Sequence, residues 1–135
     1  MNLPTKEELC TFVEKSISNK QYNEEIIFPL PEITIEKLKG KLPFNMIGYS
    51  CVISSHSVRH IKKGHPNDLR YICEIIDILE NFDKVIKSLT RCNKTGANLT
   101  SLEFYKKFDN NVVKLVKLKI HKDKKLELKT IFVKD

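Results

Sequence analysis

Residues 54–66 gather most of the side chains in this sequence that could do chemistry. Three of the four histidines lie there, and Arg59, Lys62 and Lys63 lie among them. An imidazole exchanges protons near neutral pH, while guanidinium and ammonium groups bind phosphate oxygens. Cleavage of a phosphodiester needs both proton transfer and stabilisation of negative charge. The segment therefore predicts a candidate nuclease site.

A short basic helix is predicted over residues 55–63. Ser54 and Ser55 suit the N-cap, and the Gly-His-Pro sequence that follows residue 63 suits a helix stop. Gly64 is expected in the left-handed cap conformation, which would turn His65 off the helix axis.

The spacing within this helix predicts two different faces. At about 100° per residue, His56 and His60 lie on one face. Arg59 and Lys63 flank that face, so two imidazoles, a guanidinium and an ammonium are expected to point outward. The apolar residues of the segment lie on the other side and can pack on a core.

Composition and charge favour a polyanionic partner. The chain has 135 residues, 41% of them hydrophobic, which suits one globular domain. Its net charge of +7 is unevenly spread: residues 1–40 hold five lysines and seven glutamates, and the remainder holds 19 basic and 10 acidic residues. This distribution suits nucleic acid, with a solvated lysine-rich surface as the alternative.

Other features predict a cytoplasmic protein without a metal or cofactor. No apolar stretch approaches the ~20 residues of a membrane span, and no basic segment followed by an apolar one opens the chain. Cys10, Cys51, Cys73 and Cys92 have no C-x-x-C spacing. Buried thiols are therefore expected rather than a zinc site.

The N-terminal third predicts packing elements without a catalytic constellation. Residues 5–19 begin with a capping-box pattern and carry an apolar stripe, which indicates an amphipathic helix. A short strand is predicted over residues 24–28 and a short helix over residues 32–39. Residues 1–43 are accordingly expected to form an N-terminal helical extension that packs on the core or binds a partner.

The remainder predicts an α+β fold, with helices first and an antiparallel sheet of about four strands afterwards. A strand over residues 44–53 precedes the basic helix, and a long helix over residues 66–81 follows it. The later segments are strand-like and joined by short polar turns: 83–89, 101–108, 112–120 and 126–134. An apolar phase slip between Leu115 and Val116 suggests a bulge. The chain is predicted to be one domain, 1–135, with its core at residues 44–135.

Four short motifs in this order are similar to those of a known group of nucleases. They are His60-Ile61-Lys62-Lys63-Gly64-His65-Pro66, Asn81-Phe82-Asp83, Ser101-Leu102-Glu103-Phe104-Tyr105-Lys106 and Lys129-Thr130-Ile131-Phe132. In this respect the last two-thirds of the chain resemble the phage-associated barnase–EndoU–colicin–RelE-like nuclease families. Phe82 stands where these families commonly have proline, and Gly64 stands where they often have lysine or arginine.

The resemblance implies a metal-independent endoribonuclease. Attack by the RNA 2′-hydroxyl would give a 2′,3′-cyclic phosphate, and DNA, which lacks that hydroxyl, would not be cut. His60 and His65 would act as general acid and base, and Thr130 would donate a hydrogen bond to the phosphate. The residues expected to bind phosphate or RNA are Arg59, Lys62, Lys63, Arg70, Tyr105 and Lys106.

Alternatives stay open for both the residues and the function. His60 and His65 could cap helix ends, and Thr130, which alternates with apolar residues, could face the core. A toxin or phage-borne effector acting on RNA such as tRNA is the leading function, with an inhibitor or immunity protein as a candidate partner. A non-catalytic nucleic-acid-binding module or a protein-interaction module on the same scaffold is the alternative.

Overall fold

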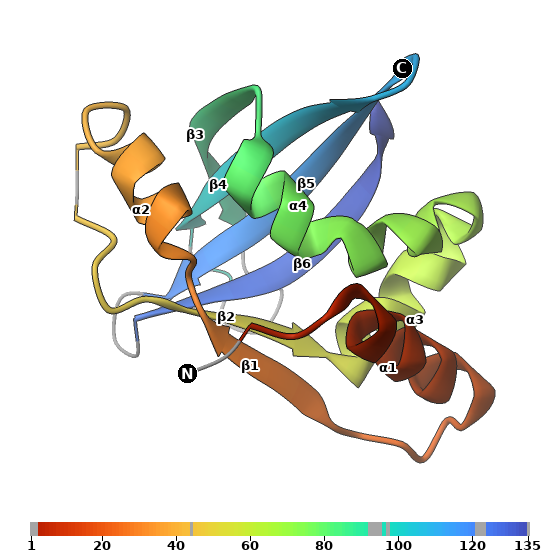
Figure 1. The fold of residues 1–135 in the computed structure, drawn as a ribbon. Coiled ribbons are helices and arrows are strands. Elements are labelled where there is room, and N and C mark those ends of the chain that lie inside the picture. The colour runs from red at the N-terminus through yellow and green to blue at the C-terminus, as the bar shows by residue number, and fades with distance from the viewer. Residues whose placement is uncertain (1–2, 44, 92–95, 97, 121–123, 135) are drawn as a thin grey trace.

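The computed structural model describes residues 3–43, 45–91, 96, 98–120 and 124–134. It forms one mixed sheet with its helices on one face (Figure 1). The elements are, in order, α1 (Lys6–Ser18), β1 (Glu25–Pro29), α2 (Glu32–Leu38), β2 (Ser50–Ser54), α3 (Ser55–Gly64), the 3-10 helix η1 (Pro66–Glu74), α4 (Ile75–Asn81), β3 (Lys84–Arg91), β4 (Asn98–Phe108), β5 (Asn111–Ile120) and β6 (Lys125–Lys134). The α+β class is as predicted.

The sheet has six strands in the order β1-β2-β6-β5-β4-β3. The four strands from β3 to β6 form the predicted antiparallel meander, in which each strand pairs with the next one along the chain. Strands β1 and β2 extend the predicted four-stranded sheet to six strands and make it mixed. Strand β2 pairs parallel with β6, and β1 pairs antiparallel with β2. The parallel pair is possible because α3, η1, α4 and the meander lie between β2 and β6 in the chain.

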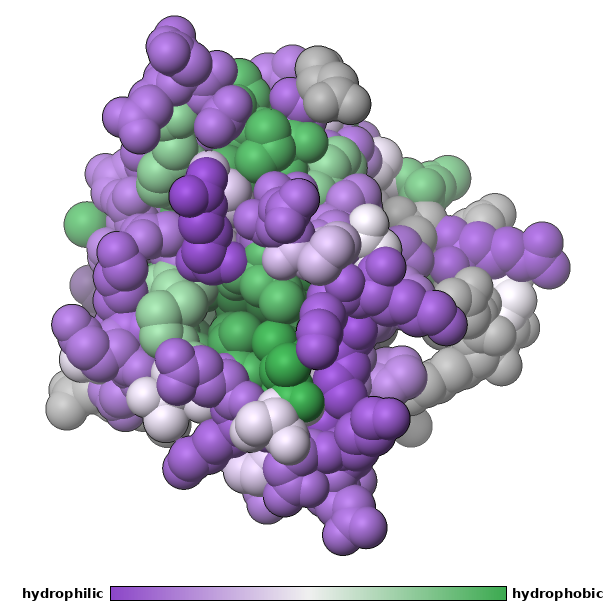
Figure 2. Space-filling model, turned by 90° about the vertical axis from the view of Figure 1, so that its right-hand side faces the viewer, coloured by the Kyte–Doolittle hydropathy of each residue, from purple (hydrophilic) through white to green (hydrophobic). Residues whose placement is uncertain are grey.

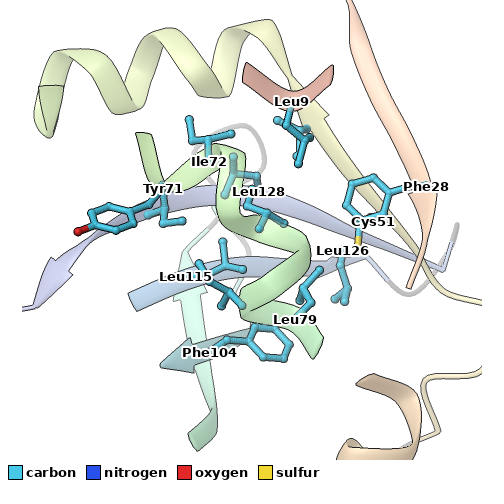
Figure 3. Close-up of a cluster of buried hydrophobic side chains, with 14 of the residues drawn as sticks. Leu9, Phe28, Cys51, Tyr71, Ile72, Leu79, Phe104, Leu115, Leu126 and Leu128 are labelled. Carbon is cyan, nitrogen blue, oxygen red and sulfur yellow. The ribbon is translucent and has the colours of Figure 1, made fainter. Parts of the chain in front are cut away.

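The hydrophobic core lies between the helices and one face of the sheet. In Figure 1, α4 and η1 cross the near face of the sheet, and α1 lies in front of β2 and α3. Figure 3 shows Leu9, Ile72 and Leu79 from the helices packed against the strand residues Leu115 and Leu128. The opposite face carries no helix within the described residues. No helix in the described part of the chain is long and apolar enough to cross a membrane.

The predicted N-terminal helix is present, with the capping box that its sequence indicated. Thr5 Oγ1 accepts from the backbone N–H of Glu8 at 3.1 Å, and the Glu8 carboxylate accepts from the backbone N–H of Thr5 at 3.0 Å. Residues 1–43 are more than helical, because they also supply β1 to the sheet.

A disulfide joins the N-terminal helix to η1. Cys10 on α1 and Cys73 on η1 are bonded, with 5.1 Å between their Cα atoms. The expectation of unpaired buried thiols is therefore wrong for these two, since residues 63 positions apart in sequence could not be matched from spacing alone. Cys51 is a free, buried thiol as predicted, and Cys92 lies outside the described residues.

Two predicted elements differ in extent. The strand predicted over residues 44–53 is strand only from Ser50 to Ser54, because Gly48, with φ of +85°, turns the chain just before it. The helix predicted over residues 66–81 is divided into η1 and α4, and the Glu74 backbone between them leaves helical geometry.

The end of α3 also differs from the prediction. Gly64 belongs to the helix and has no positive φ, so the predicted left-handed cap is wrong. The helix ends instead at His65, with φ of −140°, whose backbone N–H still donates to the carbonyl of Ile61 at 2.6 Å. The chain turns there because Pro66 opens η1.

One extra residue in β6 reverses which side chains face the core. Val116 on β5 pairs with Thr130, but the next residue, Lys117, pairs with Leu128, so Lys129 is bulged out. Before the bulge Leu126 and Leu128 are buried, and after it Ile131 is buried. The bulge predicted in β5 therefore lies in the partner strand.

The apolar phase slip in β5 has a different cause. Lys117 occupies a core-facing position, where its side chain has no exposed surface and lies opposite Leu102 and Leu128. Its Nζ has no hydrogen-bond partner among the described residues. Burial lowers the pKa of Lys117, and the neighbouring Cys51 and Glu127 act in the opposite direction. Lys117 thus occupies a position at which the alternation of β5, with Val113 and Leu115 buried, would place an apolar residue.

Candidate active site

A carboxylate lies at the centre of the open face of the sheet. Glu103 on β4 points away from the core, because Leu102 and Phe104 on either side of it are fully buried on the helix side. Its side chain is 17% exposed, so solvent can still reach it. This position gives the face one acidic group that is shielded but accessible.

Three side chains from three strands hold the Glu103 carboxylate. Tyr105 Oη donates to Oε1 at 2.8 Å and Ser88 Oγ donates to Oε2 at 2.6 Å. Lys114 Nζ lies 3.1 Å from Oε1. A carboxylate offers about four acceptor positions, so one is left for another donor.

The pKa values in this cluster favour the ionised pair. Burial acts to raise the pKa of Glu103, but the hydrogen bonds from Ser88, Tyr105 and Lys114 outweigh it and lower the pKa overall. Burial acts to lower the pKa of Lys114, and the hydrogen bond and charge of Glu103 outweigh it and raise that pKa. Burial and the bond to Glu103 both raise the pKa of Tyr105. Glu103 is therefore a carboxylate and Lys114 an ammonium at neutral pH.

Three lysines surround the ring of Tyr105. The Nζ atoms of Lys84, Lys134 and Lys114 lie 5.0, 5.2 and 5.8 Å from its ring centroid. They come from β3, β6 and β5, and they converge because the register places all of them on the open face. With Glu103 as the acidic member, this cluster has an excess of positive charge. Such a surface attracts phosphate.

The ring of His65 reaches the edge of this face. It stacks on Phe132, with ring centroids 4.8 Å apart and an angle of 14° between the planes. Phe132 pairs directly with Lys114 across the β5–β6 ladder, and Lys114 Nζ lies 5.6 Å from the Phe132 ring. Asp68 helps to hold η1 there by accepting from the backbone N–H of Val133 at 3.1 Å. His65 is therefore next to the cluster, although it comes from the end of α3.

Thr130 lies on the same face as the cluster. The bulge at Lys129 turns it away from the core, so it is half-buried and pairs with Val116, which in turn pairs with Glu103. Two strand spacings of about 4.8 Å separate Thr130 from Glu103, which places their backbones roughly 10 Å apart. The side chain of Val116, which is 6% exposed, lies between them on this face.

Other predicted residues of α3 lie on its solvent side. His56, His60, Lys62 and Lys63 are all exposed, while the apolar residues of α3 are buried as the helical spacing predicted. Figure 2 shows the side of the molecule that lies to the right in Figure 1, where hydrophilic residues surround a hollowed hydrophobic patch. Among the three predicted catalytic residues, the structure brings His65 and Thr130 to the sheet face and leaves His60 on the helix surface.

Arg59 does not point outward as the helical wheel suggested. Its guanidinium donates to the backbone carbonyls of Ser16 and Tyr22 at 2.9 and 3.0 Å and to the side chain of Asn23 at 2.8 Å. These acceptors lie at the end of α1 and in the loop after it, which α3 packs against. Arg59 thus ties two helices together, and its planar set of donors suits three separate acceptors.

We expect Arg59→Ala to lower the free energy of unfolding by about 2–3 kcal/mol, because hydrogen bonds from a charged donor are lost. Arg59→Lys should recover only part of the lost free energy of unfolding, since an ammonium group cannot reach all three acceptors. Urea unfolding measures both. Lys62→Ala is the control, because it removes a cation from the exposed side of α3. Unchanged stability in Arg59→Ala would contradict this role.

Two further predicted residues lie away from Glu103. Lys106 follows Tyr105 on β4 and therefore points to the helix side, where its Nζ lies 3.8 Å from Asp77. The Arg70 guanidinium donates to Tyr71 Oη at 2.9 Å and lies over the ring of Tyr71 on η1. Of the residues expected to bind RNA, Tyr105 is the one within the cluster.

The sequence interpretation missed Glu103, Lys114 and Ser88. A usable signal was present in β4, where polar Ser101, Glu103 and Tyr105 alternate with apolar Leu102 and Phe104 and so mark the side of the strand that faces away from the helices. The partners on β3 and β5 required the strand register, which sequence does not give. Within the described residues, no group of three or more His, Cys, Asp and Glu side chains is placed to hold a metal ion.

The sequence of this chain matches a protein-family model. Residues 31–135 match the model of the phage-Barnase-EndoU-ColicinE5/D-RelE like nuclease 3 family. The chain belongs to this nuclease family. Searches of curated proteins and of solved structures returned no significant match.

The family match covers every strand from β2 to β6 and therefore the whole Glu103 cluster. It confirms the predicted resemblance to these nuclease families, and nucleic acid is the substrate class of a nuclease family. The match begins just before α2, so α1 and β1 lie outside it. The disulfide and the hydrogen bonds of Arg59 therefore join the region matched by the family model to the N-terminal segment that lies outside the match.

Proposed function

We propose that this protein is an endoribonuclease that cuts RNA by attack of the 2′-hydroxyl on the adjacent phosphorus. The observation that supports this proposal most is the ionised Glu103 held beside Lys114 on the open, cationic face of the sheet. A carboxylate can accept the 2′-hydroxyl proton, and lysines can stabilise the negative charge on the phosphorane.

Each side chain near Glu103 has a role in this proposal. Glu103 takes the proton as the 2′-oxygen bonds to phosphorus, and Lys114 and Thr130 bind the non-bridging oxygens. The bond from phosphorus to the 5′-oxygen then breaks, and His65 gives that oxygen a proton. Phe132, stacked on His65, offers a surface on which a base can stack. The products are a 2′,3′-cyclic phosphate and a free 5′-hydroxyl.

His60 is the other candidate for the acid. It lies on the exposed side of α3, whereas His65 stacks on Phe132, so the proposal gives His65 the larger role. His65→Ala should slow cleavage by about 100-fold or more, and His60→Ala by less than threefold, in single-turnover assays. The reverse order would assign the proton donor to His60.

Purified protein should cut total RNA in the presence of EDTA and leave 2′,3′-cyclic phosphate ends. An oligonucleotide with one 2′-deoxy substitution should resist cleavage at that nucleotide alone, because the attacking oxygen is missing. Gel electrophoresis with mass spectrometry of the fragments measures both. Cleavage at the deoxy position would overturn the proposed chemistry.

A non-catalytic nucleic-acid-binding module is the second candidate. It is favoured by the three hydrogen-bonding partners that already occupy Glu103. It predicts RNA binding that weakens steeply with salt, without cleavage under any of these conditions. For the endoribonuclease, the proposed substrate is RNA such as tRNA. For both candidate functions, an inhibitor or immunity protein with an acidic surface would fit the lysines around Tyr105.

A further inference from the structure

A cavity away from Glu103 is lined by residues of α1, η1 and the end of β4. Its volume is about 320 Å³, and its lining residues include both halves of the disulfide, Cys10 and Cys73, with Lys6, Arg70, Glu74 and Asp109 around them. Cys10 is half-buried and Cys73 is 7% exposed. A disulfide that lines an open cavity can be reached by a small molecule, whereas one within the core cannot.

The cavity is lined by two cations, Lys6 and Arg70, and two carboxylates, Glu74 and Asp109, which suits a zwitterionic thiol. Arg70 is exposed, and it lies three residues before Cys73 on a 3-10 helix, where residues at this spacing stack on one another. A cation beside a sulfur favours the thiolate and therefore favours its departure. Lys6, paired with Glu74 at 2.5 Å, lines the same cavity and adds a second cation to it.

We propose that this cavity is a thiol–disulfide exchange site, and that the redox state of Cys10–Cys73 controls how firmly α1 holds η1. The chemical class of reactant is a low-molecular-weight thiol peptide such as reduced glutathione. This site is separate from the sheet face, so the exchange reaction does not depend on the proposed function.

The exchange proceeds in two balanced steps. The sulfur of a small thiolate attacks Cys10 Sγ, a new S–S bond forms, and the Cys10–Cys73 bond breaks with its electron pair leaving on Cys73 Sγ. A second thiol then attacks the mixed disulfide and releases the Cys10 thiolate. Two small thiols are thus oxidised to one disulfide, and their two protons end on the two cysteines.

The consequence for the fold follows from what the disulfide connects. α1 is also joined to α3, through the hydrogen bond from Ser16 Oγ to Ser55 Oγ at 3.1 Å and through Arg59. α3 and η1 meet at His65, which stacks on the sheet face. α1 is therefore held against both α3 and η1. Reduction removes the covalent link to η1 and leaves the Lys6–Glu74 ion pair as the polar contact named here on that side.

The test uses the folded full chain with Cys92→Ser, so that each remaining cysteine can be assigned. After incubation with millimolar reduced glutathione and a pulse of iodoacetamide, peptide mapping should find Cys10 as the glutathione mixed disulfide or both Cys10 and Cys73 alkylated. Cys51, which is fully buried, should stay unmodified and reports that the protein is folded.

Two variants sharpen the exchange assay. Arg70→Glu should slow the reaction about threefold to tenfold, because it repels the carboxylates of glutathione and disfavours the leaving thiolate. Lys20→Glu, which makes the same charge change at an exposed position outside the cavity, should change the rate by less than twofold. Equal slowing by both variants would overturn the role of the cavity.

Thermal unfolding measures the effect on the fold. Reduction should lower Tm by on the order of 10 °C, and Cys10→Ser should have the lower Tm with or without thiol. A disulfide that resists glutathione until the protein unfolds would overturn the proposal, as would free thiols at Cys10 and Cys73 in the oxidised protein. If exchange occurs but neither redox form cuts RNA, the exchange site stands and the proposed nuclease function fails.

Discussion

Replacement of Glu103 with glutamine is expected to slow RNA cleavage by about 100- to 10,000-fold, the usual contribution of a general base. Glutamine keeps the size of the side chain and a carbonyl acceptor for Tyr105 or Ser88, but it cannot take a proton. Glu103→Asp should give an intermediate rate, because it keeps the carboxylate and withdraws it from the substrate. Single-turnover cleavage of a defined RNA measures both effects.

The matched control is Glu14→Gln, which makes the same substitution on the exposed surface of α1. It should leave the cleavage rate unchanged within twofold. Because Lys114 loses its charged partner in Glu103→Gln, Tm is measured as well, and assays are run well below it. A Glu103→Gln protein that is folded and cuts RNA at the wild-type rate would remove Glu103 from the mechanism.

The pH dependence offers an independent check on the same group. Since the pKa of Glu103 lies below that of an ordinary glutamate, the base stays ionised at neutral pH and is lost only as pH falls through that lowered value. Lys114→Met removes one of the hydrogen bonds that lower this pKa, so the acid limb of the rate profile should move to higher pH. An unmoved acid limb would mean that another group controls it.

Replacement of Lys117 with methionine is expected to stabilise the protein by about 2–4 kcal/mol at neutral pH. The Lys117 side chain is fully buried and its Nζ has no hydrogen-bond partner among the described residues, which is a costly state, and methionine fills a similar volume. Urea unfolding measures the change. Lys107→Met, at an exposed position on β4, is the control and should stay within about 0.5 kcal/mol of wild type.

The benefit of Lys117→Met should shrink as pH rises. Burial lowers the pKa of Lys117 in the folded state, so above that pKa the unfolded chain binds a proton that the folded chain does not. The wild-type free energy of unfolding therefore gains from this group as pH rises toward the ordinary lysine pKa, whereas the variant gains nothing. The comparison also cancels most of the opposite contribution of Cys51, whose pKa is raised by burial. A constant difference between the two proteins from pH 7 to 10 would contradict the buried charge.

Most elements of the fold could be predicted because each has a local cause. The capping box and apolar stripe define α1, and short polar stretches of sequence separate the segments that form β3, β4, β5 and β6. The mixed sheet could not be predicted, because the pairing of β2 with β6 depends on contacts between residues far apart in sequence. The disulfide could not be predicted for the same reason, because Cys10 and Cys73 are 63 positions apart in sequence.

The candidate site was predicted in part, and the limit is again physical. Clustering of histidines along the chain pointed to α3, and His65 does reach the sheet face through its stack on Phe132. Glu103, Lys114 and Ser88 are isolated in sequence and meet only through strand register. Arg59 resembled a phosphate ligand because charge alone does not tell whether a guanidinium faces solvent or a backbone carbonyl.

The bulge at Lys129 shifts the alternation of buried and outward-facing residues along β6 by one position. Residues before it line the interior on the same side as Ile131 after it, although three positions separate Leu128 from Ile131. A strand of this length without the bulge would bury Thr130 and Phe132 and expose Ile131 to water, whereas deletion of the bulged Lys129 itself would keep all three on their present sides. The position of the bulge is thus as strongly constrained as the composition of the strand, because pairing in strict alternation through Lys129 would disrupt core and site together, where most single substitutions would affect one of them.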